Sequence, residues 1–304
     1  MPLMPLMPLM PQTTRTFRLA TRASPLALWQ ARWVASRLRA AHPGLRVVLV
    51  PMHSSGDLDR VTTLYQSSTV GVFVREIQAA VLAGQADAGV HSCKDLPTTS
   101  PTGLIVASIQ PRADVRDALV TREGLTLREL PHGAVIGTSS LRRQTQLAHL
   151  RPDLRFVPIR GNVDTRLRKI HDGEADATIL AMAGLHRLGL VARSRAVALD
   201  PWHESVPAPA QGAVALDCRT DDVRTRRLLL TINHLPTWRA ISIERQILGD
   251  LEGGCSLPLG CLIKRTPEGR WRARIRLGDL HAPLREMTLD GDPMTFVARA
   301  RAIR

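Results

Sequence analysis

The sequence predicts an α/β fold in which two similar α/β domains, joined by a double hinge, are followed by a small α+β domain. Apolar, strand-like segments alternate with amphipathic helical segments from residue 17 onward. The alternation occurs twice, and GQADAGVHS (84–92) and GEADATILA (173–181) share a Gly-x-Ala-Asp-Ala lead into a strand. From about Asp221 the pattern changes to helical runs and short alternating segments. We therefore expect a parallel sheet with helices on its faces in each of the first two domains.

The first domain begins with a strand over 17–22 and a helix that starts after it. Ser24 is placed to cap that helix, Pro25 occupies its first position, and the amphipathic pattern runs to about His42. The elements expected next are a strand over 46–52, a helix over 71–84 and a strand over 86–92.

The second domain repeats this order. The expected elements are a strand over 134–140, a helix over 141–150, a strand over 155–160, a helix over 162–171 and a strand over 175–181. Proline-rich joints lie near 110–114 and 200–212, and GAVALDCR (212–219) reads as a strand that returns to the first sheet. Two crossings of this kind permit opening and closing around a ligand.

The resulting division has one extension and three domains. We expect a disordered extension at 1–16, a first domain at 17–110 and 211–230, a second domain at 111–210, and a third domain at 231–304. In the third domain, two helical runs precede RWRARIRL (270–277) and PLREMTLDG (283–291), whose alternation indicates a small antiparallel sheet.

Composition narrows the function classes. No stretch approaches the roughly twenty apolar residues of a membrane helix. The four cysteines are too few and too scattered for a disulfide framework or a zinc site, so we expect no metal and a reducing cytoplasm. The formal charge of +14 raises the possibility of nucleic-acid binding, but aromatic residues are only 3% and there is no compact basic tail. Three of the 41 basic residues are lysines and the other 38 are arginines, the side chain best suited to bidentate recognition of carboxylates.

The loop EGGCSLPLG (252–260) displays Cys255 directly after two glycines. A free cysteine is most often a small buried hydrophobe, but a thiol on so bare a loop can also react or carry an attached group. No histidine lies near it in sequence, although His91 or His203 could approach it in space.

The segment HSCKDLPTT (91–99) places Lys94 and Asp95 at the carboxyl end of a predicted strand, where ligands bind in open α/β sheets. Asp95 either caps the turn before Pro97 or stabilises a cation and transfers a proton. GTSSLRRQ (137–144) and RGNVDTRL (160–167) offer arginines at further strand ends. A single arginine is usually a solvated surface charge, but several at the strand ends of one sheet indicate a small polycarboxylated ligand.

Seven ordered motifs resemble those of the porphobilinogen deaminase (hydroxymethylbilane synthase) family. They are LATRASPLALWQA, GVHSCKDLPT, IGTSSLRRQTQL, RPDLRFVPIRGNVDTRL, ILAMAGLHRLGL, QGAVALDCR and LEGGCSLPLG, and the match runs from about Phe17 to Cys261. The resemblance implies a periplasmic-binding-protein-like pair of domains. It also implies an enzyme that condenses four porphobilinogen molecules head to tail, with release of ammonia, to give hydroxymethylbilane.

The resemblance implies a role for each matching residue. Cys255 would hold a dipyrromethane cofactor through a thioether, and Asp95 would be the catalytic carboxylate. Positions matching cofactor-binding residues are Lys94, Ser140, Arg142, Arg143 and Arg166, and those matching substrate-binding residues are Arg22, Ser24, Arg160 and Arg187. The expected partner is porphobilinogen alone, without nucleic acid or membrane, and the expected state is a monomer.

The chain departs from the family pattern in three places. Within 53–73, Ser68, Thr69 and Val70 stand where the family has the Gly-Gly-Lys of a mobile lid. Ala210 occupies a position where the family often has glycine, and the C-terminal end is abbreviated. Two alternatives remain: a non-catalytic small-anion binding protein of the same two-lobed fold, which would need neither Cys255 nor Asp95, and a nucleic-acid-binding protein, which would associate in a salt-sensitive way.

Overall fold

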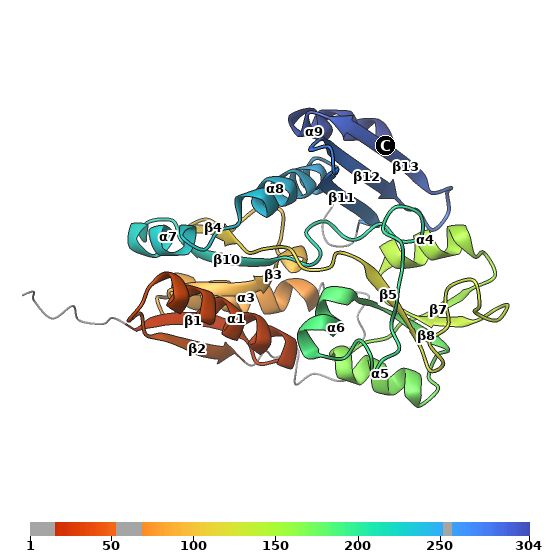
Figure 1. Cartoon of the computed structure of the whole chain (residues 1–304), viewed down its shortest axis with the longest axis horizontal. Coiled ribbons are helices and arrows are strands. Elements are labelled where there is room, and N and C mark those ends of the chain that lie inside the picture. The colour runs from red at the N-terminus through yellow and green to blue at the C-terminus, as the bar shows by residue number, and fades with distance from the viewer. Residues whose placement is uncertain (1–15, 53–68, 252–256) are drawn as a thin grey trace, which may run out of the picture.

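The computed structural model describes residues 16–52, 69–251 and 257–304. The predicted extension up to residue 15, residues 53–68 of the predicted lid, and Cys255 lie outside these ranges. Among the described residues the strands form three sheets, of which the third lies above the other two in the view of Figure 1. This arrangement agrees with the predicted α/β fold, while the exact division into domains stays a prediction.

The first sheet has the strand order β2-β1-β3-β10-β4. Its strands are β1 (Phe17–Arg22), β2 (Val47–Met52), β3 (Ala88–Ser92), β4 (Leu104–Ile109) and β10 (Val214–Arg219). Its helices are α1 (Pro25–Ala41), α3 (Thr69–Leu82) and α7 (Val223–Leu230). Alternate residues of β3 bury opposite faces: Ala88 and Val90 join the core beneath α1 and α7, while Gly89 faces Ile77 of α3.

The second sheet has the order β7-β6-β8-β5-β9. Its strands are β5 (Asp117–Thr121), β6 (Val135–Gly137), β7 (Arg155–Val157), β8 (Ala177–Ala181) and β9 (Val197–Ala198), and its helices are α4 (Leu141–Leu150), α5 (Val163–His171) and α6 (Met182–Leu188). Leu147 of α4 packs on one face with Ile136 and Ile179, while Leu185 of α6 packs on the other with Val120 and Leu180. Each of the first two sheets is therefore covered by helices on both faces.

The two sheets, expected to be parallel, are mixed, because each contains one antiparallel strand. β10 runs antiparallel to both β3 and β4, and β5 runs antiparallel to both β8 and β9. These are the strands that follow the two crossings between the sheets, the first over residues 110–116 and the second over residues 199–213. A chain that arrives from the neighbouring sheet enters from the opposite end, whereas a strand–helix–strand unit returns the chain to the same end. The predicted return of 212–219 to the first sheet is confirmed.

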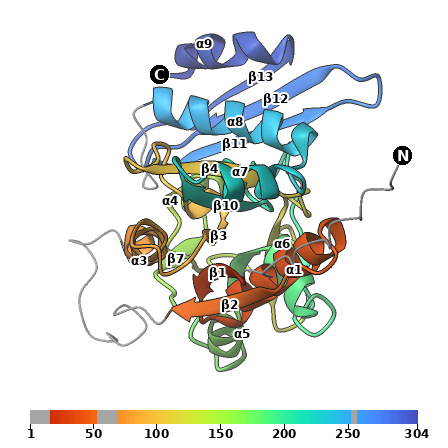
Figure 2. The same cartoon turned by 90° about the vertical axis from the view of Figure 1, so that its left-hand side faces the viewer.

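The third sheet is antiparallel, as predicted, in the order β11-β12-β13. Its strands are β11 (Leu259–Arg265), β12 (Trp271–Leu277) and β13 (Arg285–Gly291), with the helices α8 (Leu235–Asp250) and α9 (Phe296–Ala300) packed against one face. Short 3-10 turns, η1 (Cys93–Asp95), η2 (Pro293–Thr295) and η3 (Arg301–Ile303), complete the elements. Figure 2 shows α8 between this sheet and the first sheet, in agreement with its contacts to β11 and β4.

A buried carboxylate joins both crossings to the third sheet. Glu244 of α8 forms a bidentate ion pair with Arg112 of the first crossing, with N···O distances of 2.7 and 3.0 Å. It also accepts hydrogen bonds from the backbone N–H of Ala210, in the second crossing, and of Ile263 in β11. Since Glu244 is fully buried, the crossings are fixed by a charged interaction that water does not screen.

None of the helices within 16–52, 69–251 and 257–304 is long and apolar enough to cross a bilayer.

Candidate active site

The carboxyl ends of β1 and β3 place three of the predicted side chains at one edge of the first sheet. Arg22 is the last residue of β1, and Lys94 and Asp95 form the turn η1 directly after β3, which lies next to β1. Ser24 caps α1, where its hydroxyl accepts a hydrogen bond from the N–H of Ala27 at 3.4 Å. Parallel neighbours end at the same edge, so this edge is where the rule for open α/β sheets expects a ligand.

The second sheet supplies the remaining predicted positions from the ends of its parallel strands. Ser140 is the N-cap of α4 after β6, Arg160 follows β7, Arg166 lies in α5, and Arg187 lies in α6 after β8. Arg160 is exposed, whereas Arg166 and Arg187 are partly buried. The Ser140 side chain forms no capping hydrogen bond, which leaves its hydroxyl available at the start of a helix.

Arg142 and Arg143 are buried and share one acidic partner, Asp117 at the start of β5. Their guanidinium nitrogens lie 2.8 and 2.7 Å from the two carboxylate oxygens, and Ser205 donates a further hydrogen bond at 2.8 Å. Burial alone would raise the pKa of Asp117, but the two guanidinium groups outweigh it and hold that pKa well below its usual range. Sequence reasoning placed both arginines on a ligand, whereas this structure pairs them with an acid inside the protein. One carboxylate between two guanidinium groups leaves a net positive charge.

Lys94 lies next to this cluster. Its Nζ donates a hydrogen bond of 3.3 Å to Oε1 of Gln211, and burial lowers its pKa to about 8. The nearby negative charges of Asp95 and Asp117 raise that pKa, and the positive charges of Arg143 and Arg142 lower it. The ammonium group therefore stands among charges from both sheets.

Asp95 and Arg166 link the two sheets electrostatically. Burial lowers the pKa of Arg166, Arg143 lowers it further, and the charge of Asp95 opposes both. The Asp95 carboxylate is thus close enough to a helix of the second sheet to act on its arginine. Nε of Arg166 donates to the carbonyl oxygen of Gly161 at 2.9 Å.

Arg187 crosses toward the first sheet. Its guanidinium donates to the carbonyl oxygen of Gly212 at 2.7 Å and lies 5.8 Å from the ring centroid of Trp29 in α1. Burial lowers its pKa to about 10. The position of Arg187 therefore depends on the second crossing and on α1 of the first sheet.

These cations fit a polycarboxylated group such as dipyrromethane. Lys94, Arg166 and Arg187 are all held by amide or carbonyl oxygens, and burial lowers the pKa of each. A half-buried cation whose hydrogen-bond partner is neutral gains from a bound carboxylate, which offsets the loss of hydration. The donor set of Lys94, Arg166 and Arg187 is therefore suited to carboxylates.

The three cysteines in the described ranges are poor nucleophiles. Cys93, Cys218 and Cys261 are free and buried, and burial raises the pKa of Cys93 to about 11 and that of Cys218 to about 12. His91, considered from the sequence as a partner for Cys255, lies buried with its Nε2 3.0 Å from Oδ1 of Asp217. It is thus committed to the interior of the first sheet.

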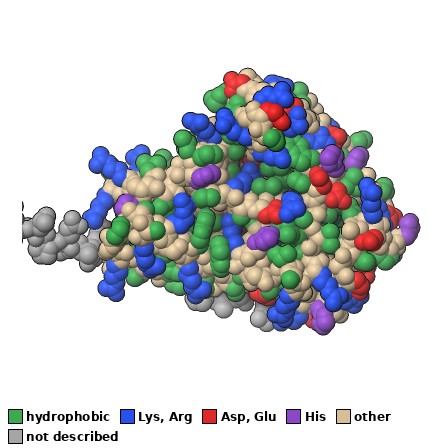
Figure 3. Space-filling model, viewed as in Figure 1, with side chains coloured by type: hydrophobic (Ala, Val, Ile, Leu, Met, Phe, Trp, Pro, Cys, Tyr) green, Lys and Arg blue, Asp and Glu red, His purple; other side chains and the backbone are tan. Residues whose placement is uncertain are grey.

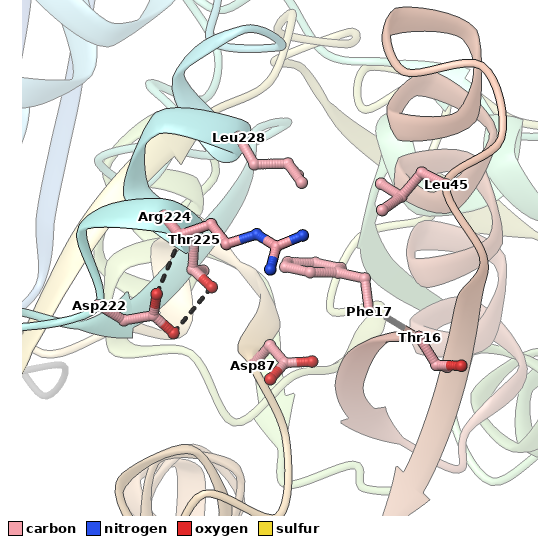
Figure 4. A pocket seen from close by; sticks show the side chains of 8 residues that line it. All are labelled: Thr16, Phe17, Leu45, Asp87, Asp222, Arg224, Thr225 and Leu228. Carbon is pink, nitrogen blue, oxygen red and sulfur yellow. Dashed lines mark hydrogen bonds between the residues drawn. The ribbon is translucent and has the colours of Figure 1, made fainter. Parts of the chain in front are cut away.

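Two surface hollows lie away from these residues. The first, shown in Figure 4, is at the amino ends of β1 and β3, the opposite edge from Asp95; its lining includes Phe17, Asp87 and Arg224. The second is a groove of about 510 Å³ on the third sheet, lined by residues such as Trp202, Lys264 and Arg272. Within the described parts of the chain, no group of three or more histidine, cysteine or acidic residues could hold a metal ion.

The basic side chains do not form one continuous face in the view of Figure 3. They are spread over the visible surface and are interrupted by apolar and acidic side chains. A nucleic-acid footprint would instead be expected to gather them in a stripe or patch.

Sequence reasoning missed Asp117 and Gln211. Both are fully buried, and Gln211 donates from Nε2 to Oδ1 of Asp117 at 3.0 Å and to the carbonyl oxygen of Val115 at 2.8 Å. No local pattern marks either residue, because their partners lie 25 or more positions away in the chain. The signals were the place of Gln211 in the second predicted joint and at the start of the motif QGAVALDCR, and the place of Asp117 three positions after the first joint.

Fold and candidate site together define a two-lobed α/β protein with basic side chains in the turns and helices that follow the parallel strands of its two sheets. The chain belongs to the porphobilinogen deaminase family: the model described as "Porphobilinogen deaminase, dipyromethane cofactor binding domain" matches residues 17–227. It is a family of transferases of tetrapyrrole biosynthesis whose substrate is porphobilinogen.

Similar solved structures share little sequence with the chain. YhfZ from Shigella flexneri is 17% identical, with 78% of this chain and 91% of that chain covered and a TM-score of 0.38. The periplasmic VFT2 domain of BvgS from Bordetella pertussis is 16% identical, with 71% and 86% covered and a TM-score of 0.41. The sulfonate-binding protein SsuA from Methylobacillus flagellatus is 14% identical, with 76% and 68% covered and a TM-score of 0.42.

Proposed function

We propose that the protein is a porphobilinogen deaminase that condenses four porphobilinogen molecules into hydroxymethylbilane. The observation that supports this best is the position of Asp95, a carboxylate at a strand end whose charge acts on Lys94 in its own lobe and on Arg166 in the other. A carboxylate that interacts with cations of both lobes suits a reaction in which the reacting centre becomes positive and the substituents are negative.

Asp95 would stabilise positive charge and accept a proton. Loss of ammonia from the aminomethyl group of porphobilinogen leaves a cation delocalised over the pyrrole ring. Attack by the free α-carbon of the preceding pyrrole forms the new carbon–carbon bond and releases a proton from that carbon. A carboxylate that accepts a hydrogen bond from pyrrole N–H stabilises the cation and is placed to take the proton.

The surrounding cations would hold the acetate and propionate groups of the pyrroles. Lys94, Ser140, Arg142, Arg143 and Arg166 are assigned to the cofactor, and Arg22, Ser24, Arg160 and Arg187 to the incoming substrate. The ion pairs with Asp117 hold Arg142 and Arg143 in place, so we expect both to act mainly through net positive charge. Arg142 can also use the guanidinium nitrogens that Asp117 does not bind, whereas Nη1 of Arg143 already donates to the carbonyl oxygen of Ile179.

Dipyrromethane, when attached through Cys255, supplies the terminal pyrrole carbon to which the first substrate is added. The other three cysteines are buried, with the pKa of each raised by burial, which leaves Cys255 as the candidate anchor.

Intact-mass analysis of the purified protein tests the anchor. We expect a covalent pyrrole adduct on the unmodified protein and on Cys261→Ser, and no adduct on Cys255→Ser. Porphobilinogen turnover, followed by release of ammonia and by formation of the linear tetrapyrrole, then tests the activity. A protein with no adduct that does not consume porphobilinogen would contradict the proposal.

The same experiments separate the two-lobed binding protein from the enzyme, because a binding protein would retain small anions without an adduct or turnover. We further propose a monomer in the cytoplasm, serving haem-type tetrapyrrole synthesis. Sedimentation of the purified protein tests the monomer.

A further inference from the structure

Gln211 is the one side chain through which Lys94 is hydrogen-bonded to the ion cluster of the second sheet, among the hydrogen bonds of the described residues. Its Oε1 accepts from Lys94 at 3.3 Å, and its Nε2 donates to Asp117 at 3.0 Å and to Val115 at 2.8 Å. From its place in the second crossing, its side-chain amide therefore makes three hydrogen bonds, to the first crossing and to groups of both sheets. Because it is fully buried, no water replaces a lost partner.

The backbone around Gln211 is held just as firmly. Its carbonyl oxygen accepts from Nε of Arg112, which is itself paired with Glu244. Its neighbours Ala210 and Gly212 both have positive φ, at 63° and 89°. A Cβ on Gly212 would lie 2.8 Å from the carbonyl oxygen of Ala113, so the two crossings touch at this point. Backbone of this kind persists only where the surroundings fix it.

The geometry points to Gln211 as a positioning residue that sets the place of Lys94 relative to the Asp117–Arg142–Arg143 cluster. The expected effect of Gln211 on turnover rests on the proposed function. The link between Gln211 and Lys94 is independent of that function and can be measured separately.

The charged groups that face Lys94 are Asp95 on its own turn and Asp117, Arg142 and Arg143 from the second sheet. A carboxylate at the place of the Gln211 amide would add a negative charge within hydrogen-bonding distance. Gln211→Glu should therefore shift the pH midpoint of Lys94 acetylation upward, by about one pH unit or more. The chain has only three lysines, so limited labelling with acetic anhydride followed by peptide mass spectrometry resolves Lys94 directly.

Gln146 provides the matched control. It is also fully buried and also binds the second crossing, exchanging hydrogen bonds with the N–H and C=O of Val206 at 2.7 and 3.1 Å. Its hydrogen bonds do not involve Lys94 or Asp117. Gln146→Glu should thus leave the Lys94 midpoint in place, and Gln146→Met should lower the melting temperature about as much as Gln211→Met.

Turnover separates positioning from general destabilisation. At a temperature where both methionine variants are folded, Gln211→Met should lower kcat for porphobilinogen by about 10- to 100-fold, as expected for misplaced binding groups. Gln146→Met should keep kcat. An unchanged Lys94 midpoint in Gln211→Glu, or equal kcat in the two methionine variants, would overturn the inference.

If Gln211→Met does not fold, the isosteric Gln211→Glu replaces it in the kinetic comparison, with Gln146→Glu as its control. Should the unmodified protein not turn over porphobilinogen, the proposed function fails while the labelling still decides the link.

Discussion

Ala210 occupies a backbone conformation that favours glycine, and replacing it with glycine should cost little stability. Its φ is 63°, and its methyl group is fully buried in a small cluster with residues such as Cys93 and Ile241. The left-handed conformation costs a non-glycine residue about 1–2 kcal/mol. Ala210→Gly gains stability by relieving that strain. It loses about 0.8 kcal/mol because a buried methyl group is removed, and about 0.4–1 kcal/mol because glycine raises the conformational entropy of the unfolded chain. The gain and the losses nearly cancel, so we expect a change within about 1 kcal/mol of zero.

Ala213 is the matched control for this prediction. It is buried in the same cluster but does not have a positive φ. Ala213→Gly therefore suffers both losses without the gain and should lower the free energy of unfolding by about 1–2 kcal/mol. In thermal melts followed by tryptophan fluorescence, the two variants should differ by about 2–4 °C. If Ala210→Gly melts as low as Ala213→Gly, the backbone at 210 is not strained and the reasoning is refuted.

Three further predictions concern the charged residues of the site. Asp117→Asn should lower the free energy of unfolding at pH 7 by about 3–5 kcal/mol, because two buried guanidinium groups lose their shared acid, and an unfolding free energy within error of the unmodified protein would contradict the cluster. Because the pKa of Lys94 is lowered to about 8 in the folded protein, the unfolded chain binds more protons than the folded one between about pH 8 and the ordinary lysine pKa of 10.5, and the free energy of unfolding should rise with pH in that window. In urea titrations Lys94→Met should flatten this rise, whereas Lys264→Met, at an exposed position, should not. Asp95→Asn should keep the melting temperature and lose most porphobilinogen turnover, while Asp164→Asn, exposed at the start of α5, should keep both; near-normal product formation by Asp95→Asn would refute its assigned role.

Periodicity was sufficient to predict most helices and strands, because their residues bury one face or one stripe. The return strand β10 and the antiparallel third sheet are confirmed. The direction of β5 and β10 was not predictable in the same way, since nothing in a strand's own residues states from which end the chain enters. Direction is decided by the crossing that precedes the strand.

The site was predictable where motifs place charge at strand ends, as for Lys94 and Asp95. It was not predictable where the ion-pair partner of a charged residue is distant in the sequence. Arg142 and Arg143 lie 25 and 26 positions from Asp117, and no spacing rule connects a helix to a strand across such an interval. Gln211 is an uncharged side chain in a proline-rich segment, so its role follows only from the partners that the fold brings to it.

The Glu244 carboxylate has a consequence for shortened forms of this protein. A chain ending before α8 would lack Glu244, so the Arg112 guanidinium and the Ala210 backbone N–H would lose their hydrogen-bond acceptor. The two crossings that join the lobes would then lose the hydrogen bonds and the ion pair that fix them. The C-terminal quarter of the chain therefore holds the two lobes in their relative positions. A fragment that contains only the lobes should differ from the full chain in their arrangement.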